Sequence, residues 1–356
     1  MASDSHSEQH GGIDPAELKR LNLSAGQLVD FSVNSNPFGP SARVLEALRQ
    51  VDIASYPDRS CSALTQQLAG LNGLPEQNIL IGNGTAELIW LAAQAFLKPE
   101  DKVIICGPTF GEYRRAAAAL QAEIIEIGGQ EPDFIFPLPR LLDEIQRLHP
   151  RLLFLCNPNN PTGRCLPAHT VAELLNVCGS HTILVLDQAY QAFVNGSFFS
   201  PAVGQNCLVL RSMTKDFALA GLRLGYALGD VHLIERLKSF QPAWSVNAFA
   251  QAAGAAALSD LDYYQHTLAQ LRQLQVPFFS DLKSIGCRLL PSDVHFALIR
   301  LAYPARDLRL KLLQSAIQVR DCASFGLPQY IRISTRLPAD NHKLLDALSS
   351  MNSAIK

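Results

Sequence analysis

Short, continuous apolar runs recur between about residues 60 and 230 and alternate with segments of helical periodicity. Several of the runs end in Gly, Asn, Asp or Ser. Strands that are apolar on both faces and are separated by helices form a mostly parallel sheet that helices cover on both sides. The runs are "NILIG", "KVIICG", "EIIEIG", "RLLFLCN", "TILVLD", "CLVLRS" and "LRLGYALG". The pattern predicts a three-layer αβα domain of the α/β class, with its ligand site at the carboxyl ends of the strands.

A second, smaller domain is expected because 356 residues exceed what one hydrophobic core usually organises. From about residue 246 the chain becomes helical, then carries short strands and a last helix, which is typical of an α+β domain. Near the N-terminus, Asp14 and Pro15 predict the start of a short helix. We expect an N-terminal arm and helix over residues 1–36 that pack with the small domain, a large domain over residues 37–245, and a small domain over residues 246–356.

The charge balance argues against nucleic acid or an anionic membrane as a partner. The net charge is −2, from 30 basic and 32 acidic side chains. No uncharged apolar run reaches the roughly 18 residues of a membrane span, and the polar N-terminus lacks an apolar signal region, so we expect a cytoplasmic protein. The scattered cysteines show no metal or disulfide spacing, and we expect reduced, mostly buried thiols and no metal site.

Two polar loops follow predicted strands in the first half of the sheet. In "LIGNGTAEL", Gly84 and Thr85 open a helix, whose free N–H groups and dipole can bind a phosphate. A plain glycine-containing turn is the alternative for this motif alone. In "CNPNNPTG", the prolines and the last glycine constrain a loop, and Asn160 is one of the amides that can hydrogen-bond a ring substituent.

Two charged residues occupy similar strand-end positions further along the chain. Asp187 closes the apolar run "TILVLD", and a buried carboxylate needs a partner, for which a cofactor cation would serve. Lys215 lies in "RSMTKDFALAGLRLGYALG", where Ser212, Thr214 and Arg223 could bind an anion. An amine in an apolar pocket can have a lowered pKa and attack a carbonyl. A surface lysine with a partly buried stem is the alternative for Lys215 taken alone.

Together, these features resemble the fold type I pyridoxal 5′-phosphate enzymes, the aspartate aminotransferase superfamily, over nearly the whole chain. The resemblance implies that Lys215 binds the cofactor aldehyde and that Asp187 pairs with the protonated pyridine nitrogen. It also implies that Asn160 and Tyr190 hydrogen-bond the ring 3′-oxygen and that Phe110 stacks on the ring. The residues implied to hold the cofactor phosphate are Gly84, Thr85, Ser212, Thr214 and Arg223.

The chain departs from the superfamily pattern at two positions. Gln188 follows Asp187 where many relatives have Glu, but the Asp and the Tyr that would touch the cofactor are kept. Phe110 occupies the stacking position where relatives often have Tyr, which removes a hydroxyl but keeps the ring face.

Within the superfamily, four segments are similar to the group that contains histidinol-phosphate aminotransferase and L-threonine-O-3-phosphate decarboxylase. They are "NSNPFGPS", "YPD", "ALAGLRLGYAL" and "VRDCASFGLPQYIRIST". Three details favour the decarboxylase: "HGG" at residues 10–12, Thr214 before the lysine, and "PAWSVNAFAQAAG". The group implies a small phosphorylated amino acid or amine as substrate and a homodimer, with Tyr56 reaching across from the other subunit. The residues implied to bind the substrate are His10, Asn34, Tyr56, Arg320 and Arg332.

The expected function is decarboxylation of L-threonine O-3-phosphate to (R)-1-aminopropan-2-yl phosphate and CO2 in cobalamin biosynthesis. The alternative is an aminotransferase for a phosphorylated amine, such as histidinol-phosphate:2-oxoglutarate aminotransferase. A non-catalytic, cofactor-binding regulator is a third class, but no stretch before residue 30 is long or basic enough for its DNA-binding module. Two positions stay open: His10 could belong only to a flexible arm, and Arg336 could equally be a surface charge.

Overall fold

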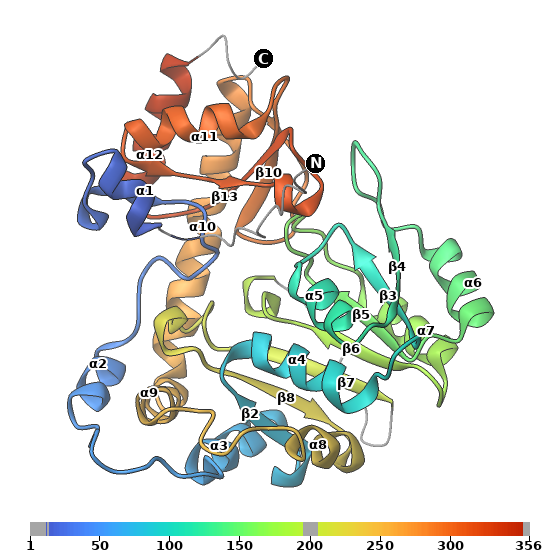
Figure 1. Ribbon diagram of the computed structural model, residues 1–356. Coiled ribbons are helices and arrows are strands. Elements are labelled where there is room, and N and C mark those ends of the chain that lie inside the picture. The colour runs from blue at the N-terminus through green and yellow to red at the C-terminus, as the bar shows by residue number, and fades with distance from the viewer. Residues whose placement is uncertain (1–11, 13, 195–205, 352–356) are drawn as a thin grey trace.

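The computed structural model describes residue 12 and residues 14–194 and 206–351. Its main feature is a 7-stranded sheet with the order β2-β8-β7-β6-β5-β3-β4, covered by helices on both faces (Figure 1). All neighbouring strands are parallel except at β8, which runs antiparallel to both β2 and β7. The strands are β2 (Ile79–Gly82), β3 (Lys102–Gly107), β4 (Glu123–Gly128), β5 (Leu152–Cys156), β6 (Ile183–Asp187), β7 (Cys207–Ser212) and β8 (Gly225–Gly229).

Both faces of this sheet are buried, because successive residues of each strand enter opposite hydrophobic clusters. In β5, Leu153 and Leu155 join the cluster under α3, α6, α7 and α9, whereas Phe154 joins the cluster under α4, α5 and α8. The helices are α2 (Ala42–Arg49), α3 (Ser62–Asn72), α4 (Gly84–Phe96), α5 (Glu112–Ala119), α6 (Leu138–Leu148), α7 (Ala168–Cys178), α8 (Val231–Lys238) and α9 (Ala248–Leu258). The three-layer fold predicted from the apolar runs is confirmed.

A smaller antiparallel sheet with the order β12-β13-β10-β9 forms the second part of the molecule. The long helix α10 extends from beside the large sheet to this small sheet, where α11 and α12 share its hydrophobic cluster (Figure 1). The elements of this second part of the molecule are α10 (Leu261–Ser284), β9 (Arg288–Leu289), β10 (Phe296–Arg300), α11 (Ala305–Gln314), β11 (Ile317–Gln318), β12 (Arg320–Asp321), β13 (Tyr330–Ser334) and α12 (Pro338–Ser350).

The segment before the large sheet lies against the small one. Helix α1 (Pro15–Arg20) begins as the sequence predicts, with the Asp14 side chain accepting a hydrogen bond from the N–H of Ala16. Strand β1 (Val29–Asp30) pairs in parallel with β11, and Phe31 belongs to the hydrophobic cluster that α10, α11 and α12 share. The domain boundaries at residues 36/37 and 245/246 stay a prediction. Helix α9, which follows residue 245, packs into the hydrophobic cluster on one face of the large sheet.

Two strand predictions need correction in detail. Among the short strands expected after residue 246, the stretch "AIQVRD" reads as one strand but forms two: β11 pairs with β1, whereas β12 pairs with β13 in the other sheet. The run "EIIEIG" forms the edge strand β4, which is half-exposed rather than buried on both faces: Glu123 and Glu126 are exposed and only Ile127 is buried.

The described part of the chain contains no helix that is long and apolar enough to cross a membrane. Every cysteine is free, and every one is buried except Cys165, which is half-buried. Burial raises the pKa of the Cys61 and Cys287 thiols to about 11. These thiols therefore stay protonated at neutral pH and behave as small core side chains.

Candidate active site

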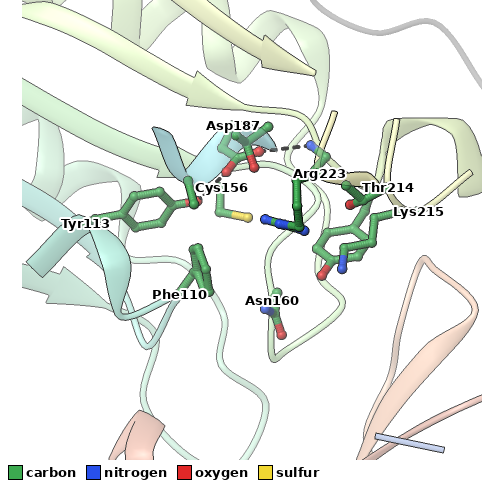
Figure 2. A pocket seen from close by; sticks show the side chains of 12 residues that line it. Phe110, Tyr113, Cys156, Asn160, Asp187, Thr214, Lys215 and Arg223 are labelled. Carbon is green, nitrogen blue, oxygen red and sulfur yellow. Dashed lines mark hydrogen bonds between the residues drawn. The ribbon is translucent and has the colours of Figure 1, made fainter. Parts of the chain in front are cut away.

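A pocket opens at the carboxyl ends of β5, β6 and β7, beside the first turn of α4. Residues at these strand ends, in the loops after them and on α5 point into it (Figure 2). The lining residues are Thr85, Ala86, Phe110, Tyr113, Cys156, Asn160, Asp187, Ala189, Tyr190, Thr214, Lys215 and Arg223. The sequence-predicted residues Gly84 and Ser212 lie directly beside them, at the start of α4 and the end of β7. Segments far apart in the chain therefore meet in one place.

Asp187 ends β6 with its carboxylate buried and hydrogen-bonded on both oxygens. The N–H of Ala189 donates to Oδ1 over 3.0 Å, and the Tyr113 hydroxyl donates to Oδ2 over 2.8 Å. Burial raises the pKa of Asp187, whereas these hydrogen bonds and the charge of Lys215 act to lower it. A buried carboxylate in this state gains from a cationic partner in the pocket.

Lys215 follows β7 and reaches the pocket from the side opposite Tyr113 (Figure 2). Its backbone carbonyl accepts a hydrogen bond of 2.8 Å from the N–H of Asn36, which fixes the chain at this residue. Burial, together with the positive charges of Arg332 and Arg223, lowers the pKa of the Lys215 amine to about 8. An amine with such a pKa is partly neutral at physiological pH and can act as a nucleophile or a base.

The start of α4 and Arg223 form one polar end of the pocket. Gly84 has φ +76°, a left-handed conformation that favours glycine, and a Cβ there would lie 2.8 Å from Nη2 of Arg223. The Ser212 Oγ and Thr214 Oγ1 atoms are 2.7 Å apart at the same end. The arrangement combines a helix N-terminus, a guanidinium and two hydroxyls, which is suited to a phosphate.

Arg332 of β13, in the small sheet, contacts the pocket-lining residue Asn160. The Arg332 guanidinium donates to Oδ1 of Asn160 and, over 2.6 Å, to the carbonyl of Ser32. Tyr190 is buried, and its hydroxyl accepts a hydrogen bond of 3.4 Å from Nδ2 of Asn34. Nε of Arg332 and Oδ1 of Asn34 are buried and have no hydrogen-bond partner among the described residues. Arg332 and Asn34 are not themselves lining residues, but they contact Asn160 and Tyr190, which line the pocket. Unpaired buried polar atoms next to a pocket can bind a polar ligand.

Arg320 lies directly opposite Arg332 in the antiparallel pair of β12 and β13. Both side chains are mostly buried, and burial, with the charge of Arg332 as a smaller cause, lowers the pKa of Arg320 to about 10. Within the described part of the chain, the ion pairs of 4.0 Å or less include no carboxylate for either guanidinium. Two buried like charges side by side are unfavourable unless an anion joins them.

Three other predicted positions do not meet the pocket in this way. Arg336 is tied to Asp340 of α12 by a contact of 3.3 Å, so its charge already has a partner. Tyr56 is 81% exposed and packs on Trp244, with the ring centroids 4.8 Å apart, outside the pocket of its own chain. His10 lies outside the described residues.

Tyr113 and Cys156 line the pocket but were not among the residues predicted from the sequence. Tyr113 lies in the first turn of α5, three residues after Phe110, which precedes the helix, and the two rings are in contact. That spacing is the signal that could have indicated Tyr113. Cys156 ends β5 beside Asp187, and its strand-end position is the corresponding signal.

The fold and this pocket define a fold type I pyridoxal 5′-phosphate enzyme. The model of the family "Aminotransferase class I and II" matches residues 26–348. The chain belongs to this family, and its cofactor is pyridoxal 5′-phosphate. The buried carboxylate of Asp187, the amine of Lys215 and the phosphate-type site at Gly84 fit that group.

Three known proteins illustrate what the chain is similar to. It is 33% identical over 341 residues to histidinol-phosphate aminotransferase of Symbiobacterium thermophilum, covering 94% of each chain. The crystal structure of histidinol-phosphate aminotransferase from Sinorhizobium meliloti with pyridoxal 5′-phosphate shares the fold, with a TM-score of 0.88, 24% identity and coverage of 99% and 98%. L-threonine-O-3-phosphate decarboxylase from Porphyromonas gingivalis matches with a TM-score of 0.81, 28% identity and coverage of 91% and 99%.

Proposed function

We propose that the chain is a pyridoxal 5′-phosphate-dependent aminotransferase that acts on a phosphorylated amine, with histidinol phosphate and 2-oxoglutarate as the first pair to test. The observation that carries the proposal is Arg332, a buried guanidinium that contacts Asn160 and forms no ion pair with a carboxylate of the described residues. It would bind the phosphate or carboxylate of a substrate through paired hydrogen bonds. The relative from S. thermophilum, similar over the full length, favours this reaction over the decarboxylation that the sequence details favour.

The residues present can hold the cofactor at each of its polar groups. Asp187 would pair with the ring nitrogen, and Asn160 and Tyr190 would hydrogen-bond the ring oxygen. Phe110 would cover one face of the ring. The cofactor phosphate would be held by Gly84, Thr85, Ser212, Thr214 and Arg223. When bound, the cofactor supplies an electron sink for a bond broken at the substrate's Cα.

In this proposal, the protein contributes orientation and a proton carrier. Arg332 and Arg320 would fix the anionic end of the substrate, and this decides which substituent of the Cα faces Lys215. The Lys215 amine would remove a proton from the substrate Cα and deliver it to the carbon of the cofactor's former aldehyde group, which is general acid–base catalysis. Its lowered pKa of about 8 leaves part of the amine neutral for this task.

The rate at which the apoprotein takes up pyridoxal 5′-phosphate covalently should depend on pH. Since only the neutral amine attacks a carbonyl, a Lys215 pKa of about 8 predicts a rate that rises with pH through pH 6 and 7 and levels off above pH 8. The rise should be about tenfold per pH unit well below the pKa. Stopped-flow absorbance of the lysine-bound cofactor measures this rate. A rate that still rises tenfold per unit at pH 9 would show an ordinary lysine.

Decarboxylation of L-threonine O-3-phosphate is the second candidate. The match to the P. gingivalis decarboxylase over 91% of the chain supports it, as do Thr214 and the "PAWSVN" segment. The same pocket can serve either reaction, because the two arginines can fix a phosphate so that either the proton or the carboxylate of the Cα is placed for cleavage. Product analysis therefore has to decide between them.

The test is to incubate the purified holoenzyme with each substrate separately. Histidinol phosphate with 2-oxoglutarate should yield glutamate, measured by a coupled dehydrogenase assay. L-threonine O-3-phosphate should yield no CO2. Formation of CO2 without glutamate would replace the proposal by the decarboxylase, and cofactor binding without turnover of any amine would favour a regulator.

We also propose a homodimer in which Tyr56 contributes to the pocket of the other subunit. Arg223 and Tyr56 are exposed in the single chain, and Tyr56 forms an exposed aromatic pair with Trp244. We expect a two-chain mass by light scattering, and activity should fall on dilution as the subunits separate. A fully active monomer would contradict the proposal.

A further inference from the structure

Tyr113 occupies a position between the two residues proposed to touch the cofactor ring. It lies on α5, is 1% exposed, and its hydroxyl donates to Oδ2 of Asp187 over 2.8 Å. The other carboxylate oxygen accepts from the N–H of Ala189. Among the described residues, each oxygen of Asp187 thus has one donor, and Tyr113 is the donor that comes from a different element.

The ring of Tyr113 is held firmly enough to act as a support. It stacks on Phe154 of β5, with ring centroids 5.2 Å apart and an interplanar angle of 16°. Its other contact is edge-to-face with Phe110, at 5.8 Å and 85°. Such pairs favour one ring orientation. The same side chain therefore contacts both Phe110 and Asp187 (Figure 2).

The electrostatics of the pair favour a charged Asp187 and a protonated Tyr113. Burial raises the pKa of Asp187, and the hydrogen bond from Tyr113 opposes that rise. Burial and the Asp187 charge raise the Tyr113 pKa well above its usual value, so the hydroxyl remains a donor. The other titratable groups that face Asp187 are Cys156 of β5 and, in the loops after β6 and β7, Tyr190 and Lys215.

We propose that Tyr113 is a positioning residue that keeps Asp187 ionised and aimed at the cofactor's ring nitrogen, and that holds Phe110 against the ring face. This inference rests on the roles of Asp187 and Phe110 in the proposed function. Tyr113 would act indirectly, through Asp187 and Phe110, because its hydroxyl is already hydrogen-bonded to Asp187.

The test compares two cofactors on the apoprotein of the full chain. Pyridoxal 5′-phosphate has the ring nitrogen, and 1-deazapyridoxal 5′-phosphate has a C–H group in its place. Tyr113→Phe keeps the ring and removes only the hydroxyl. At pH 6.5 it should weaken the binding of pyridoxal 5′-phosphate about tenfold, the order expected for losing a hydrogen bond to a charged group. Binding of the deaza analogue should change less than about twofold, since it needs no ionised Asp187.

The pH dependence gives a second readout. Without the hydroxyl, the Asp187 pKa rises further, so the carboxylate is regained as the pH increases. The loss of affinity should therefore shrink between pH 6.5 and pH 8.5. Dissociation constants from quenching of protein fluorescence measure both effects, and they need no turnover.

Tyr264→Phe is the matched control. Tyr264 is also buried, and its hydroxyl accepts a hydrogen bond from the N–H of Ser41, away from the pocket. This variant should bind both cofactors as the unmodified chain does. If Tyr113→Phe weakened both cofactors equally, or neither, Tyr113 would only fill space and the proposal would be wrong.

Failure of the proposed function gives a different pattern. An absence of glutamate and CO2 would reject the reaction but leave the binding comparison intact. Equal affinity of the unmodified chain for the two cofactors would reject the role of Asp187 and, with it, the role of Tyr113.

Discussion

Replacement of Lys215 by alanine is expected to abolish the absorbance band of the lysine-bound cofactor and nearly all activity. Lys215 lines the pocket with a pKa lowered to about 8, and both its proposed tasks need the amine. Loss of general acid–base catalysis alone costs about 100- to 10 000-fold in rate, and loss of covalent attachment adds to this. The measurements are an absorption spectrum of the reconstituted protein and the rate of product formation.

Lys238→Ala provides the comparison for this variant. Lys238 is exposed at the end of α8 and does not line the pocket, so its loss should leave the spectrum and the rate unchanged. A Lys215→Ala protein that kept the band would mean that another lysine holds the cofactor.

Arg332→Gln should reduce kcat/KM for the phosphorylated substrate about 100- to 1000-fold while the spectrum of the bound cofactor persists. Arg332 is buried, and removal of one partner from a buried ion pair costs about 3–5 kcal/mol. The loss is therefore expected in the step that uses the substrate's charge. Steady-state kinetics on the reconstituted variant measure it.

Arg336→Gln is the natural control because it removes the same charge four residues along the chain. Arg336 pairs with Asp340, so the change should be within about twofold, as is usual for a surface pair. The role assigned to Arg332 would be refuted by equal effects of the two substitutions. The Arg332 variant should also raise the Lys215 pKa, because the Arg332 charge is one of the groups that lower it.

Local sequence patterns were sufficient for the elements of the large sheet and for the residues at its strand ends. Apolar runs such as "TILVLD" can be buried on both faces only within a covered sheet. Asp187 ends this run, and it therefore lies at the carboxyl end of the strand. The same patterns do not give strand direction. The run "LRLGYALG" forms β8, which runs antiparallel to its neighbours, although its composition resembles that of the parallel strands.

Side chains whose role depends on a neighbour from another element could not be predicted. In the sequence, Tyr113 is an ordinary tyrosine of a helix. In the structure, α5 brings its hydroxyl within hydrogen-bond distance of Asp187. The sequence left the role of Arg336 open, and its pairing with Asp340 became visible only in the structure, as did the contact of Arg332 with Asn160.

The amino-acid sequence by itself determined the layered fold, the cofactor and the strand-end residues around it, because hydrophobic periodicity and the order of motifs are local properties of the chain. Only the tertiary structure decided that Tyr113 supports Asp187, that Arg320 and Arg332 lie side by side, and that Arg336 has its own partner. The physical reason is that hydrogen bonds and charge pairing act over a few ångströms in space, whatever the separation along the chain.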